Sequence, residues 1–271
     1  MKTSEQFKDW VFRYQYIYNS RKSDHKKERF IHALLKDIVA FRTDVTVVES
    51  TQAPITRDLY IGDVKKAKRI ICTYYDTPME AFGAYTFFDT KKQAKKTLAY
   101  LYGTSLLLFV LGVCLTLTYI RFAPHAFDFS SPITWLSVLG FGLYFLGLRH
   151  VTKGSPVRKN LIRNTSSILA ILEMSRQQEV DTAYMLIDRG CYGLENLNEH
   201  KRINPNAQWI YLDSIGAHAP LHRVDKQEKT GKTTYIFAAQ QKNQHYYLSK
   251  KQLKERYLNM ENLTQVFKWC L

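Results

Sequence analysis

The sequence predicts an α/β domain that is interrupted by a transmembrane hairpin. Short apolar runs that end in polar residues and glycine, together with segments of helical periodicity, are typical of alternating strands and helices. Two long apolar stretches without charge lie in the middle of the chain and have the length of membrane spans. With 271 residues, of which 45% are hydrophobic, the chain can bury one domain core and still supply these spans.

The first part of the chain predicts two helices and three strands. Residues 4–18 place Phe7, Trp10, Val11, Tyr14 and Ile17 at helical spacing, which favours a helix packed on the domain. A second helix is expected after Ser23 or Asp24 as N-cap. Its apolar residues on one face are Phe30, Ile31, Leu34, Leu35 and Ile38. Short strands follow at residues 45–50, 57–63 and 69–76.

The middle of the chain predicts two transmembrane helices. Residues 97–120 carry no charge, and about 20 apolar residues suffice to cross the hydrocarbon core. The second span covers about residues 130–149, where the apolar run of residues 132–148 is extended by its flanks. The predicted division is therefore 1–90 and 154–271 for the two parts of the α/β domain, with the hairpin at 91–153.

Basic residues predict the orientation of the hairpin. Lys91, Lys92, Lys95 and Lys96 precede the first span, whereas Arg149, Lys153, Arg158 and Lys159 follow the second. The connecting loop holds only Arg121, so the positive-inside rule puts both ends of the hairpin in the cytoplasm. The first twenty residues lack the apolar core of a signal peptide. We expect a multi-pass protein of the cell membrane, with both termini and the α/β domain cytoplasmic.

The segment after the hairpin predicts a helix and two buried strands. Residues 160–178 form an amphipathic pattern whose apolar side holds Leu161, Ile168, Ile171 and Leu172, and residues 181–197 and 207–217 contain the strands. Reactive groups gather at the carboxyl ends of strands in open α/β sheets, so residues 188–193 and 213–216 should line any cleft. Further on, a hairpin turning at Thr230 and Gly231 is expected. One or two helices end the chain, with Leu253, Tyr257, Leu258 and Phe267 facing inward.

Four short motifs occur in an order that resembles the co-catalytic zinc aminopeptidases, a fold shared with glutaminyl cyclases and the transferrin-receptor ectodomain. They are Tyr-Tyr-Asp at 74–76, Arg-Asn-Thr-Ser-Ser at 163–167, Gly-Cys-Tyr-Gly-Leu at 190–194 and Asp-Ser-Ile-Gly at 213–216. That family has His-x-Asp, Asp-Asn-Ala-Ser-Gly, Glu-Glu-x-Gly-Leu and Asp-x-x-Gly at the matching places. The resemblance implies a three-layer domain with a mixed sheet.

The same resemblance implies that the metal ligands are lost. Tyr74 stands in place of a His that binds metal, and Arg163 stands in place of the bridging Asp. Gly190 stands in place of the general-base Glu, and Cys191 in place of a ligand Glu. Asp213 is still a residue that can bind a metal ion, and Asp76 resembles a residue of the family that orients a metal ligand. A guanidinium cannot be deprotonated, so Arg163 would repel a zinc pair. We call the residues at these positions the vestigial cleft: Tyr74, Asp76, Arg163, Asn164, Gly190, Cys191 and Asp213.

The expected function is therefore binding by a catalytically inactive relative of the zinc aminopeptidases, with no catalytic residue, metal or cofactor. A receptor-like or accessory subunit of a membrane complex, related to transport or secretion, fits this class. The alternative is a metal-dependent hydrolase or cyclase whose zinc ligands are Asp76, Asp213 and His218.

The strongly basic composition, with a formal charge of +15, raises nucleic acid or an anionic membrane as partners. Basic residues beside the spans explain part of this charge, and no aromatic and basic stripe of a nucleic-acid module is present. We expect the lipid bilayer and a membrane protein as partners, and no nucleic acid. The four cysteines show neither metal-site nor disulfide spacing, which favours a reduced compartment.

Overall fold

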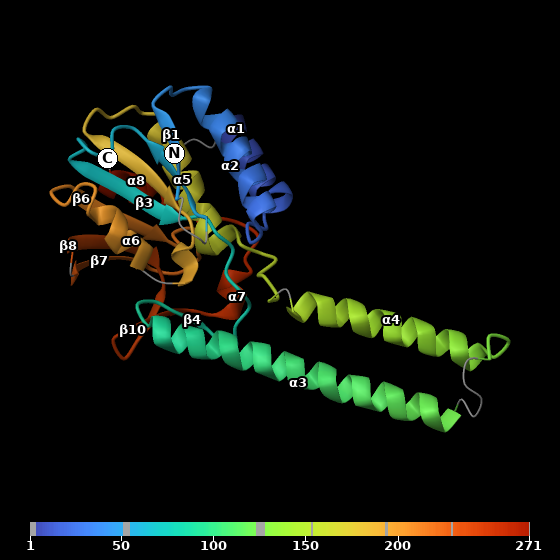
Figure 1. Ribbon diagram of the computed structural model, residues 1–271. Coiled ribbons are helices and arrows are strands. Elements are labelled where there is room, and N and C mark those ends of the chain that lie inside the picture. The colour runs from blue at the N-terminus through green and yellow to red at the C-terminus, as the bar shows by residue number, and fades with distance from the viewer. Residues whose placement is uncertain are drawn as a thin grey trace. The chain divides into compact units, whose positions relative to one another are not determined.

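A computed structural model describes residues 4–50, 55–122, 128–152, 154–192, 195–228 and 230–270 (Figure 1). The chain forms two compact units. Unit 1 consists of Met1–Pro78, Ala84–Thr90 and Val157–Leu271, and unit 2 of Met79–Gly83 and Lys91–Pro156. Gly193, Leu194 and Lys153, which entered the motif and hairpin predictions, lie outside the described residues.

Unit 1 is built on a seven-stranded mixed sheet with the order β1-β2-β5-β3-β6-β8-β7. Strands β5, β3, β6 and β8 run parallel, whereas β1, β2 and β7 are antiparallel to their neighbours. The α/β class is thus confirmed. The strand bounds are β1 Val45–Glu49, β2 Arg57–Ile61, β3 Arg69–Tyr74, β5 Thr182–Ile187, β6 Gln208–Asp213, β7 Leu221–Glu228 and β8 Gly231–Ala238.

The core lies on both faces of this sheet. All six residues of β5 are buried, and so are the last five residues of β3 and of β6. Strands buried on both faces read as continuous apolar runs, which is why these three were recognisable in the sequence. The predicted hairpin is also present, because Glu228 pairs with Gly231 across the turn between β7 and β8.

The first helix ends in a π-helical turn. Helix α1 (Glu5–Phe12) is capped by the Ser4 side chain and continues as η1 (Arg13–Ile17). A π-helix has more residues per turn than an α-helix, so the facing of the side chains shifts. Ile17, predicted to pack inward, is instead exposed, whereas Phe7, Trp10 and Tyr14 are buried. Helix α2 (Asp24–Val39) follows the sequence pattern and buries Phe30, Ile31, Leu34 and Ile38.

The helix after the hairpin differs from its prediction. Residues Leu161–Thr165 form a π-helical turn, η2, which leads into α5 (Ser166–Ser175). Nearly every residue of both is buried, so the segment is a core helix rather than an amphipathic one. Its contacts with β3, β5 and β6 place it against the centre of the sheet.

A smaller sheet and several short helices complete unit 1. The strands β4 (Tyr85–Thr86), β10 (His245–Leu248) and β9 (Gln240–Lys242) pair in that order. The helices are η3 (Gly190–Tyr192), α6 (Glu195–Lys201), α7 (Lys250–Leu253) and α8 (Met260–Cys270). Tyr257 lies between α7 and α8 and is 79% exposed, so its predicted inward position is wrong. The helical pattern did not reveal that the helix stops there.

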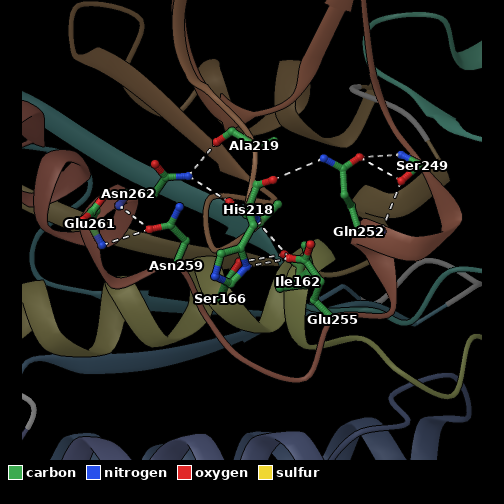
Figure 2. A network of polar contacts seen from close by, with 11 residues as sticks. Ile162, Ser166, His218, Ala219, Ser249, Gln252, Glu255, Asn259, Glu261 and Asn262 are labelled. Atoms are coloured by element: carbon green, nitrogen blue, oxygen red, sulfur yellow. Dashed lines mark hydrogen bonds and ion pairs between the residues drawn. The ribbon is translucent and has the colours of Figure 1, made fainter.

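The loop after β6 is held by the C-terminal segment (Figure 2). Glu255 accepts a hydrogen bond from the His218 backbone at 3.0 Å and lies 3.0 Å from His218 Nδ1. The Asn262 amide donates to the carbonyls of Ala217 and Ala219, both at 2.9 Å. Gly216 lies where these segments meet, because a Cβ there would come within 2.7 Å of Ser166 Cβ and 2.6 Å of Leu258.

Unit 2 consists mainly of two long apolar helices, α3 (Thr90–Phe122) and α4 (Pro132–Thr152). They pack side by side, since Gly140 lies near Leu115, Gly147 near Leu108 and Gly112 near Tyr144 (Figure 1). Both are long and apolar enough to cross a membrane. Most of their large apolar side chains are exposed within the chain.

The substitution Gly216→Ala should lower the free energy of unfolding of unit 1 by about 1–3 kcal/mol, because a methyl group overfills a tightly packed junction. Denaturant unfolding of the full chain in detergent, followed by near-UV circular dichroism, measures this change. Gly142→Ala is the control, since no atom lies within 4 Å of a Cβ built there, and it should cause no loss. Equal stability of both variants would contradict the packing described.

Candidate functional site

The residues of the vestigial cleft lie at the carboxyl ends of the central strands. Tyr74 is the last residue of β3 and Asp213 the last residue of β6, while Asp188 directly follows β5. These three strands are parallel neighbours, so their carboxyl ends meet. Turn η2 brings Arg163 and Asn164 to the same place, because both contact residues at the end of β3.

Arg163 is buried between two tyrosines. Its Nε donates a hydrogen bond to the hydroxyl of Tyr74 at 2.9 Å, and its guanidinium carbon lies 4.0 Å from the centre of the Tyr85 ring. A cation over an aromatic face is attracted by the ring, more strongly where water is excluded. Only 8% of Arg163 is exposed, so the aromatic rings replace most of its hydration.

Asp213 receives hydroxyl hydrogen bonds at the same site. Tyr85 donates to one carboxylate oxygen at 2.8 Å, and Ser214 donates to the other at 2.8 Å. The Tyr74 hydroxyl lies 3.5 Å from that second oxygen. Burial raises the pKa of Asp213 above its usual range, and the charge of Arg163 and these hydroxyl donors oppose the increase. The ionised carboxylate therefore depends on its neighbours rather than on water.

The pKa of Arg163 responds to the same surroundings. Burial acts to lower it, but Tyr74, Tyr85 and Asp213 raise it, and the net pKa is above its usual value. Arg163 therefore remains a permanent cation at the carboxyl end of the sheet.

A second cluster surrounds Asp76. Its carboxylate accepts hydrogen bonds from the backbone N–H of Cys191 at 3.2 Å and from the Cys191 thiol, and its backbone carbonyl accepts one from the Asn164 amide at 2.7 Å. Burial raises the pKa of Asp76, while the hydrogen bonds from Cys191 oppose the increase. Asp76 and Cys191 are thus already engaged with each other.

Arg21 supports this cluster and was missed in the sequence. It is fully buried, donates to Asn164 at 2.8 Å and to Thr165 at 2.7 Å, and stacks over Phe30. Burial lowers its pKa to about 10, which nearby Asp76 counteracts, so it is still charged at neutral pH. Its position between two predicted helices carried no signal, because a basic residue in a polar stretch is normally solvated.

A third buried cation lies beside Asp188. Lys27 contacts its carboxylate at 2.5 Å, and both residues are less than 10% exposed. The backbone N–H of Asp188 in turn donates to Asp58 at 2.7 Å. Each of the three carboxylates near the ends of β3, β5 and β6 therefore has a buried basic side chain in its vicinity: Arg21 near Asp76, Lys27 beside Asp188 and Arg163 near Asp213.

Gly190 lies directly against the side chain of Tyr74. A Cβ at position 190 would lie 2.3 Å from the Cβ of Tyr74, a separation that real structures do not tolerate. No side chain fits at Gly190 without moving β3 or η3. The position that the resemblance assigns to the general-base Glu is consequently closed by the side chain of Tyr74.

The alternative zinc ligands are not gathered by the fold. His218 lies in the loop after β6, with a 54% exposed side chain that pairs with Glu255, whereas Asp76 contacts Cys191 and Asp213 contacts Tyr85. Among the residues that the structure describes, no group of three or more His, Cys, Asp or Glu side chains could hold a metal ion. The donors that are present do not fit a zinc pair, since cations occupy their surroundings.

Sequence reasoning also missed Tyr85. It belongs to a segment that also places Phe87 against Phe237, with ring centres 4.5 Å apart. The only signal was a cluster of aromatic residues at 82–88, directly before the first apolar helix. Such a cluster is equally typical of a membrane interface, so its role in the cleft could not be predicted.

Comparisons with known proteins give one structural similarity. No family model and no curated protein matches the sequence. The structure is similar to that of a glutaminyl cyclase from Bacteroides thetaiotaomicron bound to N-acetylhistamine, with 14% sequence identity and a TM-score of 0.39. The match covers 82% of this chain, which spans 63% of the cyclase chain.

The substitution Arg163→Met should lower the free energy of unfolding by about 3–5 kcal/mol, because it leaves Asp213 buried beside no cation. In the double variant with Asp213→Asn, the loss should be smaller than the sum of the two single losses by about 0.5–3 kcal/mol. Denaturant unfolding of all four proteins gives this coupling energy. Additive losses would show that the two side chains do not depend on each other.

Proposed function

We propose that this protein is a membrane-anchored, catalytically inactive relative of the zinc aminopeptidases that acts by binding. In this proposal the α/β unit serves as a docking surface in the cytoplasm. The two apolar helices fix it in the bilayer and contact a membrane-protein partner. The whole protein would then be an accessory subunit of a membrane complex, related to transport or secretion.

The observation that carries this proposal is the cation of Arg163. By the motif order it stands where the family has the carboxylate that bridges two metals. Here it is buried, hydrogen-bonded to Tyr74 and stacked on Tyr85. Placing two divalent cations next to this fixed charge would be strongly unfavourable at a buried site.

The rest of the cleft supports the same conclusion. Asp76 is engaged by Cys191, Asp188 by Lys27 and Asp213 by Tyr85, so each potential ligand already has a partner. Gly190 has no room for an acid in place of the general base. A hydrolase needs a nucleophile or an activated water beside a group that accepts its proton. The contacts of the three carboxylates support the proposal that none of them takes that role.

The exposed surface of the two long helices supports a membrane partner. Leu106, Leu107, Phe109 and Leu136 are each more than 60% exposed within this chain. Lipid tails can cover such a surface. Small residues leave room for another helix, and at Gly142 a built Cβ would have no neighbouring atom within 4 Å. Nucleic acid is not needed to explain the basic charge.

Zinc analysis of the purified full chain tests the inactive assignment. We expect no stoichiometric zinc after loading and dialysis, and no aminopeptidase or glutaminyl cyclase activity. The double variant Tyr74→His, Arg163→Asp should bind zinc more tightly, because it restores two ligand types and removes the cation. Stoichiometric zinc in the native chain, lost together with activity in Asp213→Ala, would instead establish the metal-dependent hydrolase or cyclase.

Cysteine labelling in intact cells tests the topology. A cysteine at Ser130 should react with a membrane-impermeant maleimide from outside, because the loop between the spans is proposed to face out. A cysteine at Gln177, in unit 1, should react only after the cells are opened. Both variants are made with Cys114→Ser, which removes the exposed native thiol. Labelling of Gln177→Cys from outside would reverse the proposed orientation.

A further inference from the structure

The two edges of the seven-stranded sheet differ in their protection. Strand β7 carries Arg223, Asp225, Lys226 and Glu228, and charged side chains on an edge strand discourage pairing with another chain. Strand β1 has the sequence Val-Thr-Val-Val-Glu, and its one charge, Glu49, is paired with Arg57 of β2 at 2.6 Å. Among the described residues, no segment pairs with the outer side of β1. The β7 edge is thus protected by charged side chains, whereas the β1 edge lacks this protection.

The register shows which backbone groups of β1 are directed outward. Gly62 donates to the Asp44 carbonyl at 2.8 Å and Ser50 donates to the Thr56 carbonyl at 2.9 Å, so even-numbered residues form the hydrogen-bonded pairs with β2. Pairs alternate in an antiparallel ladder, so the N–H and C=O groups of Val45, Val47 and Glu49 point away from β2. An extended strand is the partner that matches three such residues at every second position.

We propose that this strand is β1 of a second copy, so that two sheets join antiparallel about a twofold axis through Val47. In this arrangement Val47 pairs with its own equivalent, and Val45 pairs with Glu49 of the second copy. All three outward-directed residues then have hydrogen-bonded partners in both copies, which is the self-complementarity that a twofold interface requires. The two Glu49 carboxylates are not opposite each other, and each keeps its own Arg57.

The side chains agree with this register. Thr46 would lie opposite Val48 of the second copy, as a pair of β-branched residues of the kind that stabilises cross-strand contacts. Both are exposed in the single chain, where 39% of Val48 is accessible. Val45 and Val47 face the other side and pack against the core, so they are held in place before pairing. Because charged side chains protect the β7 edge, association would end at two copies rather than continue into a filament.

A charge-swap experiment on the exposed pair tests the proposal. The variant Thr46→Lys, Val48→Lys puts lysine opposite lysine at both ends of the interface, whereas Thr46→Lys, Val48→Glu puts lysine opposite glutamate. Sedimentation velocity of the full chain in detergent measures dimerisation. The native chain and the Lys/Glu variant should form dimers, and the Lys/Lys variant should dimerise about tenfold or more weakly, since like charges directly opposite destabilise a ladder.

Two results would overturn the proposal. If the native chain stays monomeric at every concentration, β1 has no second copy as partner. If the Lys/Lys variant dimerises as tightly as the Lys/Glu variant, the contact lies elsewhere, for example between the apolar helices, which are unchanged in all variants. Thermal unfolding of each variant shows that the chain is folded, and Val47→Pro gives an independent check. It removes one outward N–H that β2 does not use and should also weaken the dimer.

Discussion

The arrangement at the carboxyl end of the sheet depends on one charge, the guanidinium of Arg163. Tyr85 connects it to Asp213, because the tyrosine ring lies under the cation while its hydroxyl donates to the carboxylate. Tyr74 makes a hydrogen bond with the same cation and, through its Cβ, determines that position 190 is glycine. The cation, the acid and the two rings are mutually required. A buried charge without these partners would be too costly to keep.

Arg21 and Lys27 extend this principle over the neighbouring strands. Both come from the N-terminal part of the chain, before the first strand, and both reach groups that are far away in sequence. Lys27 contacts Asp188 after β5, and Arg21 contacts Asn164 of η2. Ion pairs and hydrogen bonds of this kind satisfy buried groups but leave little freedom for a ligand to replace them. Arg21 and Lys27 are therefore both held by partners at the carboxyl end of the sheet.

The sequence predicted the sheet better than the site. Apolar runs such as Arg69–Tyr74 and Thr182–Ile187 are buried on both faces, and this property is visible in the residues themselves. Arg163 and Gly190 could also be singled out in the sequence, through the order of the motifs. The side chains that contact these residues could not be predicted from the sequence. Tyr85 and Arg21 reach the cleft only through long-range packing, and periodicity could not indicate that Ile17 leaves the core after a π-helical turn.

The strand order also constrains how the chain is made. Strand β3 lies between β5 and β6, yet both of these neighbours follow α3 and α4 in the chain. During synthesis, the ribosome must therefore complete the apolar pair of helices before β3 can gain either lateral partner. An early strand with two open sides is exposed to misassembly for that interval. Folding of unit 1 on the nascent chain would thus be coupled in time to the synthesis of the two apolar helices.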